Sequence, residues 1–411
     1  MIKKITSKDE SQKIQDAKQF PRIGSFLRKH IEDFLKNNKF AKTLATRMEQ
    51  ETGTRFSDWI DCFVFPDDAQ MRKKIQKLGF SHYGKHKDIF IAERTSFPRI
   101  LIRDSYFEIF VVVDSIVKFR ARHGLQEPID GNACSLIRKM SIANKRDYIL
   151  SIIERTTMTP HTIPLEISDE SAAKQKKAFD LWCNRERIFT SATEGVRQTL
   201  ALAYRIVDMV GVNGAAYIVL QTELRYWQYK SHVGDLQKFF QNKLGLGWGN
   251  IDHFTFWSSR KNFKILIQIF EVLGFRCTKN FFVKDYGNKG VQIMEHENSG
   301  ILVACEVHLK KKEKRQDFAH MDLVPMQTSG IVDNWLRASG ESILNGGAKH
   351  IAIRCDIQKM QTHMEKHGVH FTNIDEKPYF KQAYSNKIVT KFENYLSLIE
   401  RNGGFHYFDF D

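Results

Sequence analysis

The sequence predicts an α+β protein built from repeated βαβββ modules, with helical segments at the N-terminus and in the middle of the chain. Two observations favour this fold class. A pattern of strand, short helix, glycine and return strand occurs three times, and the stretches outside it have apolar residues at helical spacing. The 411 residues are enough for two or three domains with a sizeable core.

The first 55 residues are expected to be helical. Apolar side chains recur there at intervals of three and four, at Phe26, Leu27, Ile31, Phe34, Leu35 and Phe40, and Gly53 is a stop signal. The same spacing predicts mostly helix from 121 to 247. The expected organisation is a helical segment (1–55), a degenerate βαβββ module (56–120), a second helical segment (121–247) and paired βαβββ modules (248–411).

The repeat itself is visible in three places. Residues 60–65 (IDCFVF) are followed by a helical pattern and Leu78-Gly79-Phe80, and residues 251–256 (IDHFTF) by a helical pattern and Leu273-Gly274-Phe275. A third copy begins with residues 350–357 (HIAIRCDI) and a helical pattern that ends at Gly368. It reaches its last strand only at residues 403–411 (GGFHYFDFD). Each copy is therefore expected to be one βαβββ module.

Composition excludes several classes of protein. Apolar residues make up 42% and charged residues 27% of the chain, which is ordinary for a soluble globular protein and excludes a disordered or collagen-like one. Six cysteines without a CxxC pair indicate a reducing compartment, so we expect a cytoplasmic protein. The start of the chain has no hydrophobic signal region, and no apolar run approaches the ~18 residues of a membrane span, so no membrane partner is expected.

The net charge of +15 is the least specific clue. It is compatible with nucleic acid, with an anionic membrane surface and with small anionic substrates steered toward a site. The one dense basic run, residues 310–315, follows a predicted strand that contains Glu306. Its E-x-H-x-K spacing is a poor match to the E-x-K of a nuclease core. A basic nucleic-acid-binding protein or nuclease therefore stays an alternative, with nucleic acid as a possible partner that is not preferred.

The three repeats resemble the vicinal oxygen chelate superfamily, which includes glyoxalases and the extradiol-type and 4-hydroxyphenylpyruvate dioxygenases. The resemblance is best over residues 245–411 and weaker over 57–118. It implies that paired modules form a curved open sheet around a divalent metal, most simply Fe(II), with Zn, Mn and Ni as alternatives. It also implies an enzyme, here a metal-dependent dioxygenase acting on a small anionic oxo-acid or another substrate with vicinal oxygens.

The resemblance assigns ligands by position. His253 and His350 occupy the first-strand histidine positions, and the carboxylate ligand is expected on the last strand, at Asp409 rather than at the terminal Asp411. The family usually has Glu there, so Asp409 is a departure. A glyoxalase-like arrangement would add Glu306, and the chemistry would then be that of an isomerase or lyase. Cys62 stands where His253 stands, so the first module is expected to have lost its metal.

Several other residues are weaker candidates. His320 lies between the modules and has no repeat counterpart. His363 and His367, four apart on a predicted helix, could coordinate a metal in principle but are interpreted as part of an exposed face. Arg354 is the candidate catalytic residue, because its guanidinium could pair with a substrate carboxylate, and Lys310 is a second cation of this kind. The sequence does not predict an oligomeric state.

Overall fold

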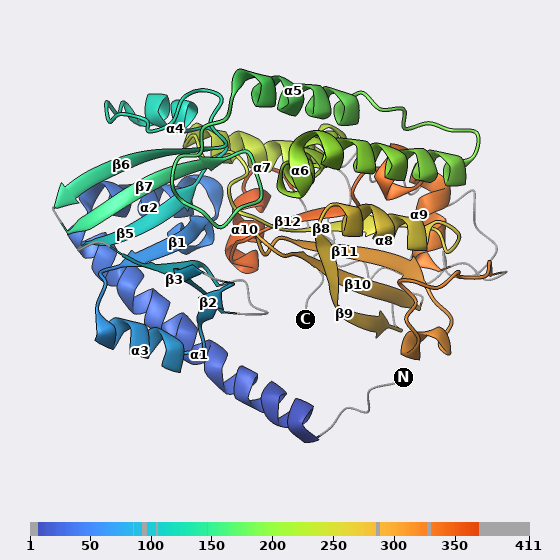
Figure 1. Cartoon of the computed structure of the whole chain (residues 1–411), viewed down its shortest axis with the longest axis horizontal. Coiled ribbons are helices and arrows are strands. Elements are labelled where there is room, and N and C mark those ends of the chain that lie inside the picture. The colour runs from blue at the N-terminus through green and yellow to red at the C-terminus, as the bar shows by residue number, and fades with distance from the viewer. Residues whose placement is uncertain are drawn as a thin grey trace. The chain divides into compact units, whose positions relative to one another are not determined.

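The computed structural model describes residues 7–84, 86–92, 97–103, 106–145, 147–284, 288–326 and 330–369 (Figure 1). The chain divides into two compact units, and each contains one open mixed sheet. The first unit comprises residues 1–130, 139–154 and 243–250, and the second comprises residues 131–138, 155–242 and 251–411. The α+β fold class predicted from the sequence is therefore confirmed.

The first unit contains a seven-stranded sheet in the order β2-β3-β4-β1-β5-β7-β6. Its strands are β1 (Ile60–Phe65), β2 (Ser81–Tyr83), β3 (His86–Ile91), β4 (Arg99–Ile102), β5 (Phe107–Val112), β6 (Ile137–Lys145) and β7 (Tyr148–Arg155). β1 pairs in parallel with β4 and antiparallel with β5. Most of the central strands β1 and β5 is buried, which accounts for their nearly continuous runs of apolar residues.

Helices cover one face of this sheet. They are α1 (Ser7–Asn37), α2 (Lys39–Thr52), α3 (Ala69–Lys77) and α4 (Ile116–His123), with a short 3-10 turn η1 (Phe56–Trp59) before β1. Phe34, Leu44 and Met48 of the first two helices lie in one core cluster with Phe63 and Phe65 of β1. The helical N-terminal segment expected from the apolar spacing is present, because burying that stripe against the sheet stabilises both helices.

The second unit contains a five-stranded sheet in the order β12-β8-β11-β10-β9. Its strands are β8 (Ile251–Trp257), β9 (Phe275–Val283), β10 (Lys289–His296), β11 (Leu302–His308) and β12 (His350–Ile353). β8 pairs in parallel with β11 and antiparallel with β12. The described helices of this unit are α5 (Asp169–Cys183), α6 (Ala192–Lys230), α7 (His232–Lys243), α8 (Phe263–Val272), α9 (Ile331–Ser339) and α10 (Ile357–Glu365), with turns η2 (Glu313–Arg315) and η3 (Ser342–Gly346).

The side chains of β8 divide between the two faces of this sheet. Alternate residues point to opposite faces, and the ring of Phe256 packs against Phe270 of α8 with centroids 5.0 Å apart. Phe254 and Phe256 therefore point toward α8. His253, Thr255 and Trp257 point to the other face.

Helix α6 contains the most apolar long stretch among the described residues. By length and composition alone it could cross a membrane, but at Gly211 its backbone leaves helical geometry (φ 73°, ψ 166°). It packs against α5 and α8, and its fully buried Glu223 forms ion pairs with Arg185 (2.7 Å) and Arg187 (3.0 Å).

The strand pairing confirms two of the predicted modules. Each module consists of a strand, a helix and three further strands: β1, α3, β2, β3 and β4 in the first unit, and β8, α8, β9, β10 and β11 in the second. In both modules the first strand lies parallel to the fourth. The glycine after each helix has a left-handed φ, 97° at Gly79 and 84° at Gly274, and a residue with a side chain adopts that conformation only with strain. β12, α10 and Gly368 (φ 84°) begin a third copy, whose expected last strand lies outside the described residues.

The predicted boundaries are wrong in one region. Residues 137–155, expected to be part of a helical segment, form β6 and β7. β5 pairs antiparallel with β1 as β12 does with β8, and α4 ends at Gly124 with φ 63°. β5, α4, β6 and β7 therefore form a further, shortened module. The sequence of β6, IRKMSIANK, is polar and weakly β-forming, so the pairing of β6 with β7 decides its conformation.

Candidate metal centre

His253 and His350 lie on the same face of the second sheet. In the antiparallel register of β8 and β12, His350 is opposite Thr255 and Ala352 is opposite His253. Directly opposed residues share a face, and Thr255 lies two residues from His253 on its strand, so both histidines point to the face away from α8. Their ring centroids are 5.6 Å apart. The two histidines, 97 positions apart in the sequence, are therefore brought together by the pairing of two first strands.

The Asp252 carboxylate binds the Nδ1 nitrogen of His253. Its Oδ2 accepts a hydrogen bond from His253 Nδ1 at 2.9 Å. Burial raises the pKa of Asp252, but the hydrogen bond from His253 and the charges of His253 and Arg354 lower it by more, so the net pKa lies below the usual range. The carboxylate is thus ionised at neutral pH, and the proton stays on Nδ1. A histidine held in this way presents its Nε2 lone pair to a metal ion.

The residues present fit a divalent metal ion. Neutral imidazole is a good ligand for first-row metals, and the carboxylate behind His253 is the support that such ligands usually have. The side chain of His253 is 33% exposed, so an ion can reach it. Asp409, the predicted carboxylate ligand, lies outside the described residues.

Glu306 is not placed with the two histidines. It lies on the same face of the sheet, but in the register of β11 and β8 it is opposite Trp257, while Leu302 is opposite His253. Four residues along a strand separate the two levels by about 13 Å. Its buried carboxylate instead accepts a hydrogen bond from Trp257 Nε1 and forms an ion pair with Lys289 at 3.0 Å. These contacts give Glu306 a structural role that the sequence did not indicate.

Arg354 lies near the histidine pair. It directly follows β12, and its positive charge is one of the influences that lower the pKa of Asp252. The guanidinium is therefore close to the Asp252–His253 pair, at the end of the strand that carries His350. This is a suitable position for contact with an anion bound beside the two imidazoles.

Asp252 was not predicted as a functional residue, although the sequence contains a signal for it. The same Ile-Asp pair begins both copies of the first strand, at residues 60–61 and 251–252. In the first unit Asp61 forms an ion pair with Arg99 at 2.5 Å, whereas in the second unit Asp252 binds His253. The aspartate that supports His253 is therefore marked in the sequence by its recurrence in the repeats.

The corresponding place in the first unit has different chemistry. Cys62 replaces His253 and is fully buried. By register Glu108 replaces His350, because it is opposite Val64 as His350 is opposite Thr255. The buried Glu108 accepts a hydrogen bond from Ser151 Oγ and lies 3.8 Å from Lys139 Nζ. Neither equivalent position offers an imidazole.

The remaining histidine candidates lie elsewhere. His320 forms ion pairs with Glu271 and Asp317, on the opposite side of the sheet from His253. The prediction that His363 and His367 lie on an exposed face is wrong for His363, which is 7% exposed and packs edge-on against Phe240. An apolar contact to α7, which the spacing within α10 does not reveal, decides its burial.

The basic run at residues 310–315 is a turn built around a buried ion pair. Both Arg260 terminal nitrogens donate to the Glu313 carboxylate, at 2.7 and 2.8 Å, and Lys310 N donates to it at 2.7 Å. Lys311, Lys312, Lys314 and Arg315 lie exposed around this pair. The run therefore has a structural explanation in the turn after β11.

Comparisons with known proteins give distant structural matches. No family model and no curated protein matches the sequence. Solved structures similar to this chain include a triple mutant of 4-hydroxymandelate synthase from Streptomyces coelicolor (10% identity, 84% of this chain, 82% of that chain, TM-score 0.22). A second is the Mn(II)-bound glyoxalase from Novosphingobium aromaticivorans (9% identity, 62% of this chain, 83% of that chain, TM-score 0.20). A third is a xylose isomerase-like TIM barrel/4-hydroxyphenylpyruvate dioxygenase fusion protein (13% identity, 87% of this chain, 48% of that chain, TM-score 0.21).

Two of these proteins are a glyoxalase and a fusion protein with a 4-hydroxyphenylpyruvate dioxygenase part, which are the kinds of protein that the repeats resemble. Their TM-scores near 0.2 do not establish an activity for this chain. The strand pairing and the side chains of this chain are the evidence for its function.

Proposed function

We propose that this chain is a metal-dependent oxygenase with one mononuclear centre in the second unit. The ligands are His253 and His350, with Asp409 as the carboxylate, and Fe(II) is the preferred ion. The observation that supports the proposal is the convergence of the two imidazoles, 5.6 Å apart, with Asp252 bound to Nδ1 of one of them. Two histidines and one carboxylate leave coordination positions for a substrate and for dioxygen.

The chemistry divides between the ion and the protein. A bound Fe(II) supplies Lewis acidity and the capacity to activate dioxygen. Asp252 keeps the proton on His253 Nδ1 and so orients the ring. Arg354 binds the carboxylate of the substrate, because a guanidinium donates two parallel hydrogen bonds to it. The substrate class proposed is a small anionic 2-oxo acid or another molecule with vicinal oxygens, and the net charge of +15 would favour its approach.

The alternatives have less support. An isomerase or lyase of the glyoxalase kind would use Glu306 as a ligand, and that carboxylate is occupied by Lys289 and Trp257. A nucleic-acid partner has no support beyond the net charge and one basic run, and the Arg260–Glu313 ion pair gives that run a structural explanation as a turn. A cytoplasmic location is part of the proposal and follows from the cysteine usage alone.

Metal binding tests the centre directly. We expect anaerobic Fe(II) titration to give tight binding for the natural protein and a loss of about 100-fold or more for His253→Ala and His350→Ala. Asp252→Asn should weaken binding by about 10- to 100-fold, because it removes the ionised support of His253. His161→Ala, at an exposed histidine, is the matched control. Wild-type affinity in both ligand variants would exclude this centre.

Oxygen consumption tests the reaction. The Fe(II)-loaded protein is assayed against a panel of 2-oxo acids and catechols in an oxygen electrode. Arg354→Gln should raise KM for a carboxylate substrate by at least about tenfold and change kcat less, since it removes a charge-assisted contact. If no member of the panel consumes oxygen above the His253→Ala background, the oxygenase proposal is wrong even where metal binding is found.

A further inference from the structure

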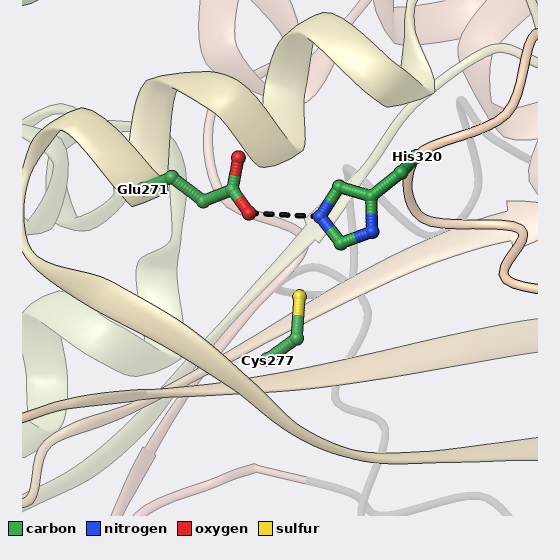
Figure 2. A group of neighbouring side chains, drawn as sticks. All are labelled: Glu271, Cys277 and His320. Carbon is green, nitrogen blue, oxygen red and sulfur yellow. Dashed lines mark hydrogen bonds and ion pairs between the residues drawn. The ribbon is translucent and has the colours of Figure 1, made fainter.

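Three different metal-ligating side chains meet on the α8 side of the second sheet. They are Glu271 at the end of α8, Cys277 on β9 and His320 in the loop after η2, and Figure 2 shows them pointing toward one another. One donor atom of each lies within 4.8 Å of the other two. Glu271 Oε1 is 2.8 Å from His320 Nε2. Three segments thus contribute an oxygen, a sulfur and a nitrogen to one place.

This cluster is separate from the histidine pair. Cys277 is opposite Met294 on β10, Met294 is opposite Val303 on β11, and Val303 is opposite Phe254 on β8. Directly opposed residues share a face, and Phe254 points toward α8. The sulfur therefore lies on the face opposite to that of His253.

The donor set matches a borderline divalent ion. Thiolate, imidazole and carboxylate are the protein ligands of Zn²⁺, and in a tetrahedral site their donor atoms lie about 3.3–3.8 Å apart. The three donor atoms of this cluster are at most 4.8 Å apart, about 1 Å more than that spacing. Glu271 and His320 are exposed and Cys277 is half-buried, so the site opens to solvent and leaves a fourth position for water.

A fourth residue orients the histidine. Asp317 Oδ2 is 2.7 Å from His320 Nδ1, on the far side of the ring from Glu271. A carboxylate bound to one ring nitrogen directs the other toward a metal ion. Asp317 therefore supports His320 in the way that Asp252 supports His253. The Asp317–His320 contact involves none of the atoms counted as the three clustered donors.

Without an ion, protons occupy two of the donors. The hydrogen bonds to Glu271 and then to Asp317 raise the pKa of His320. Burial, followed by the charges of Glu271 and Asp317, raises the pKa of Cys277 to about 11. An arriving ion would displace the Nε2 proton of His320 and the thiol proton of Cys277, and the resulting thiolate together with the Glu271 carboxylate would balance its charge.

We propose that Glu271, Cys277 and His320 form a second divalent-metal site, suited to Zn²⁺, on the α8 face of the second sheet. The ion would join the end of α8, the start of β9 and the loop after η2. This inference does not depend on the oxygenase proposal, because it uses none of the same residues.

Cobalt substitution tests the site, since thiolate ligation gives Co²⁺ a near-ultraviolet charge-transfer absorption that imidazole and carboxylate ligands do not produce. We expect one equivalent of Co²⁺ to produce this band in the full-length protein and Zn²⁺ to displace it. Cys277→Ser should abolish the band, and His320→Gln should weaken Co²⁺ binding by at least about tenfold. Binding should strengthen from pH 6.5 to pH 8, because two protons leave.

Matched variants separate this site from the other. Cys183→Ser changes an exposed cysteine and should keep the band, as should His253→Ala and His350→Ala. Circular dichroism of each sample shows whether it is folded, and Glu271→Gln, an exposed and nearly isosteric change, gives a second test of binding. Absence of the band in the natural protein, or its persistence in Cys277→Ser, overturns the proposal. The Fe(II) titrations of the histidine pair are repeated in the Cys277→Ser background, so that binding at this cluster is not counted there.

Discussion

Acid should destabilise the second unit through one buried histidine at the end of β10. His296 is 1% exposed, and its ring packs edge-on against Phe275 with centroids 5.1 Å apart. Nδ1 accepts a hydrogen bond from the backbone N–H of Asn298 at 3.3 Å, and Nε2 has no hydrogen-bond partner among the described residues. Burial lowers the pKa of this imidazole to about 4. Protonation in the folded state therefore places a charge in an apolar site.

The magnitude follows from the two pKa values of His296. The unfolded chain binds a proton near pH 6.5 and the folded chain near pH 4, so between these values acid favours unfolding. The free energy of unfolding that depends on a neutral His296 is fully present above pH 6.5 and is lost as the pH falls toward 4. The gap of about 2.5 pKa units corresponds to about 3 kcal/mol in all, of which about 2 kcal/mol is lost by pH 5.

Hydrogen exchange measures this loss locally. The free energy of opening of β9, β10 and β11 is compared at pH 7.5 and pH 5 in the natural protein, in His296→Asn and in His161→Asn. Asparagine keeps an acceptor where Nδ1 was but cannot take up the proton, so His296→Asn should lose about 2 kcal/mol less than the natural protein. The exposed His161 should make no difference. If all three proteins lose the same free energy, the reasoning about His296 is refuted.

Two further predictions concern stability in each unit. Glu223→Gln leaves two buried guanidinium groups without their counter-charge and should cost about 3 kcal/mol or more in chemical denaturation, whereas the exposed Glu170→Gln should change stability far less. Gly249→Ala would place its Cβ 2.1 Å from the backbone oxygen of Val112 and should lower the free energy of unfolding by about 2–3 kcal/mol. Gly24→Ala is the matched control: it lies inside α1 with open space around it and should raise the free energy of unfolding by about 1 kcal/mol. A Gly249→Ala protein as stable as the natural one would show that the backbone can move apart there at little cost.

Part of the candidate site could be predicted from the sequence because the strand–helix–glycine pattern that carries it is repeated. The strand, helix and glycine signals are local, and their recurrence in the sequence is enough to place His253 and His350 at equivalent positions. The partner of His253 was adjacent in the sequence and equally visible. Glu306 was a reasonable candidate by type, but which side chain a carboxylate meets depends on register, and β11 places it opposite Trp257.

By itself the sequence determined the α+β class, the helical N-terminal segment and the two βαβββ modules at β1–β4 and β8–β11, because each depends on apolar spacing and on glycines needed at left-handed positions. Tertiary structure alone decided the rest. Pairing with β7 made a strand of the polar β6, burial set the pKa of His296, and folding brought Cys277 and His320 together from 43 positions apart. The physical reason is that desolvation and ligand geometry depend on neighbours distant along the chain, which a periodic pattern does not specify.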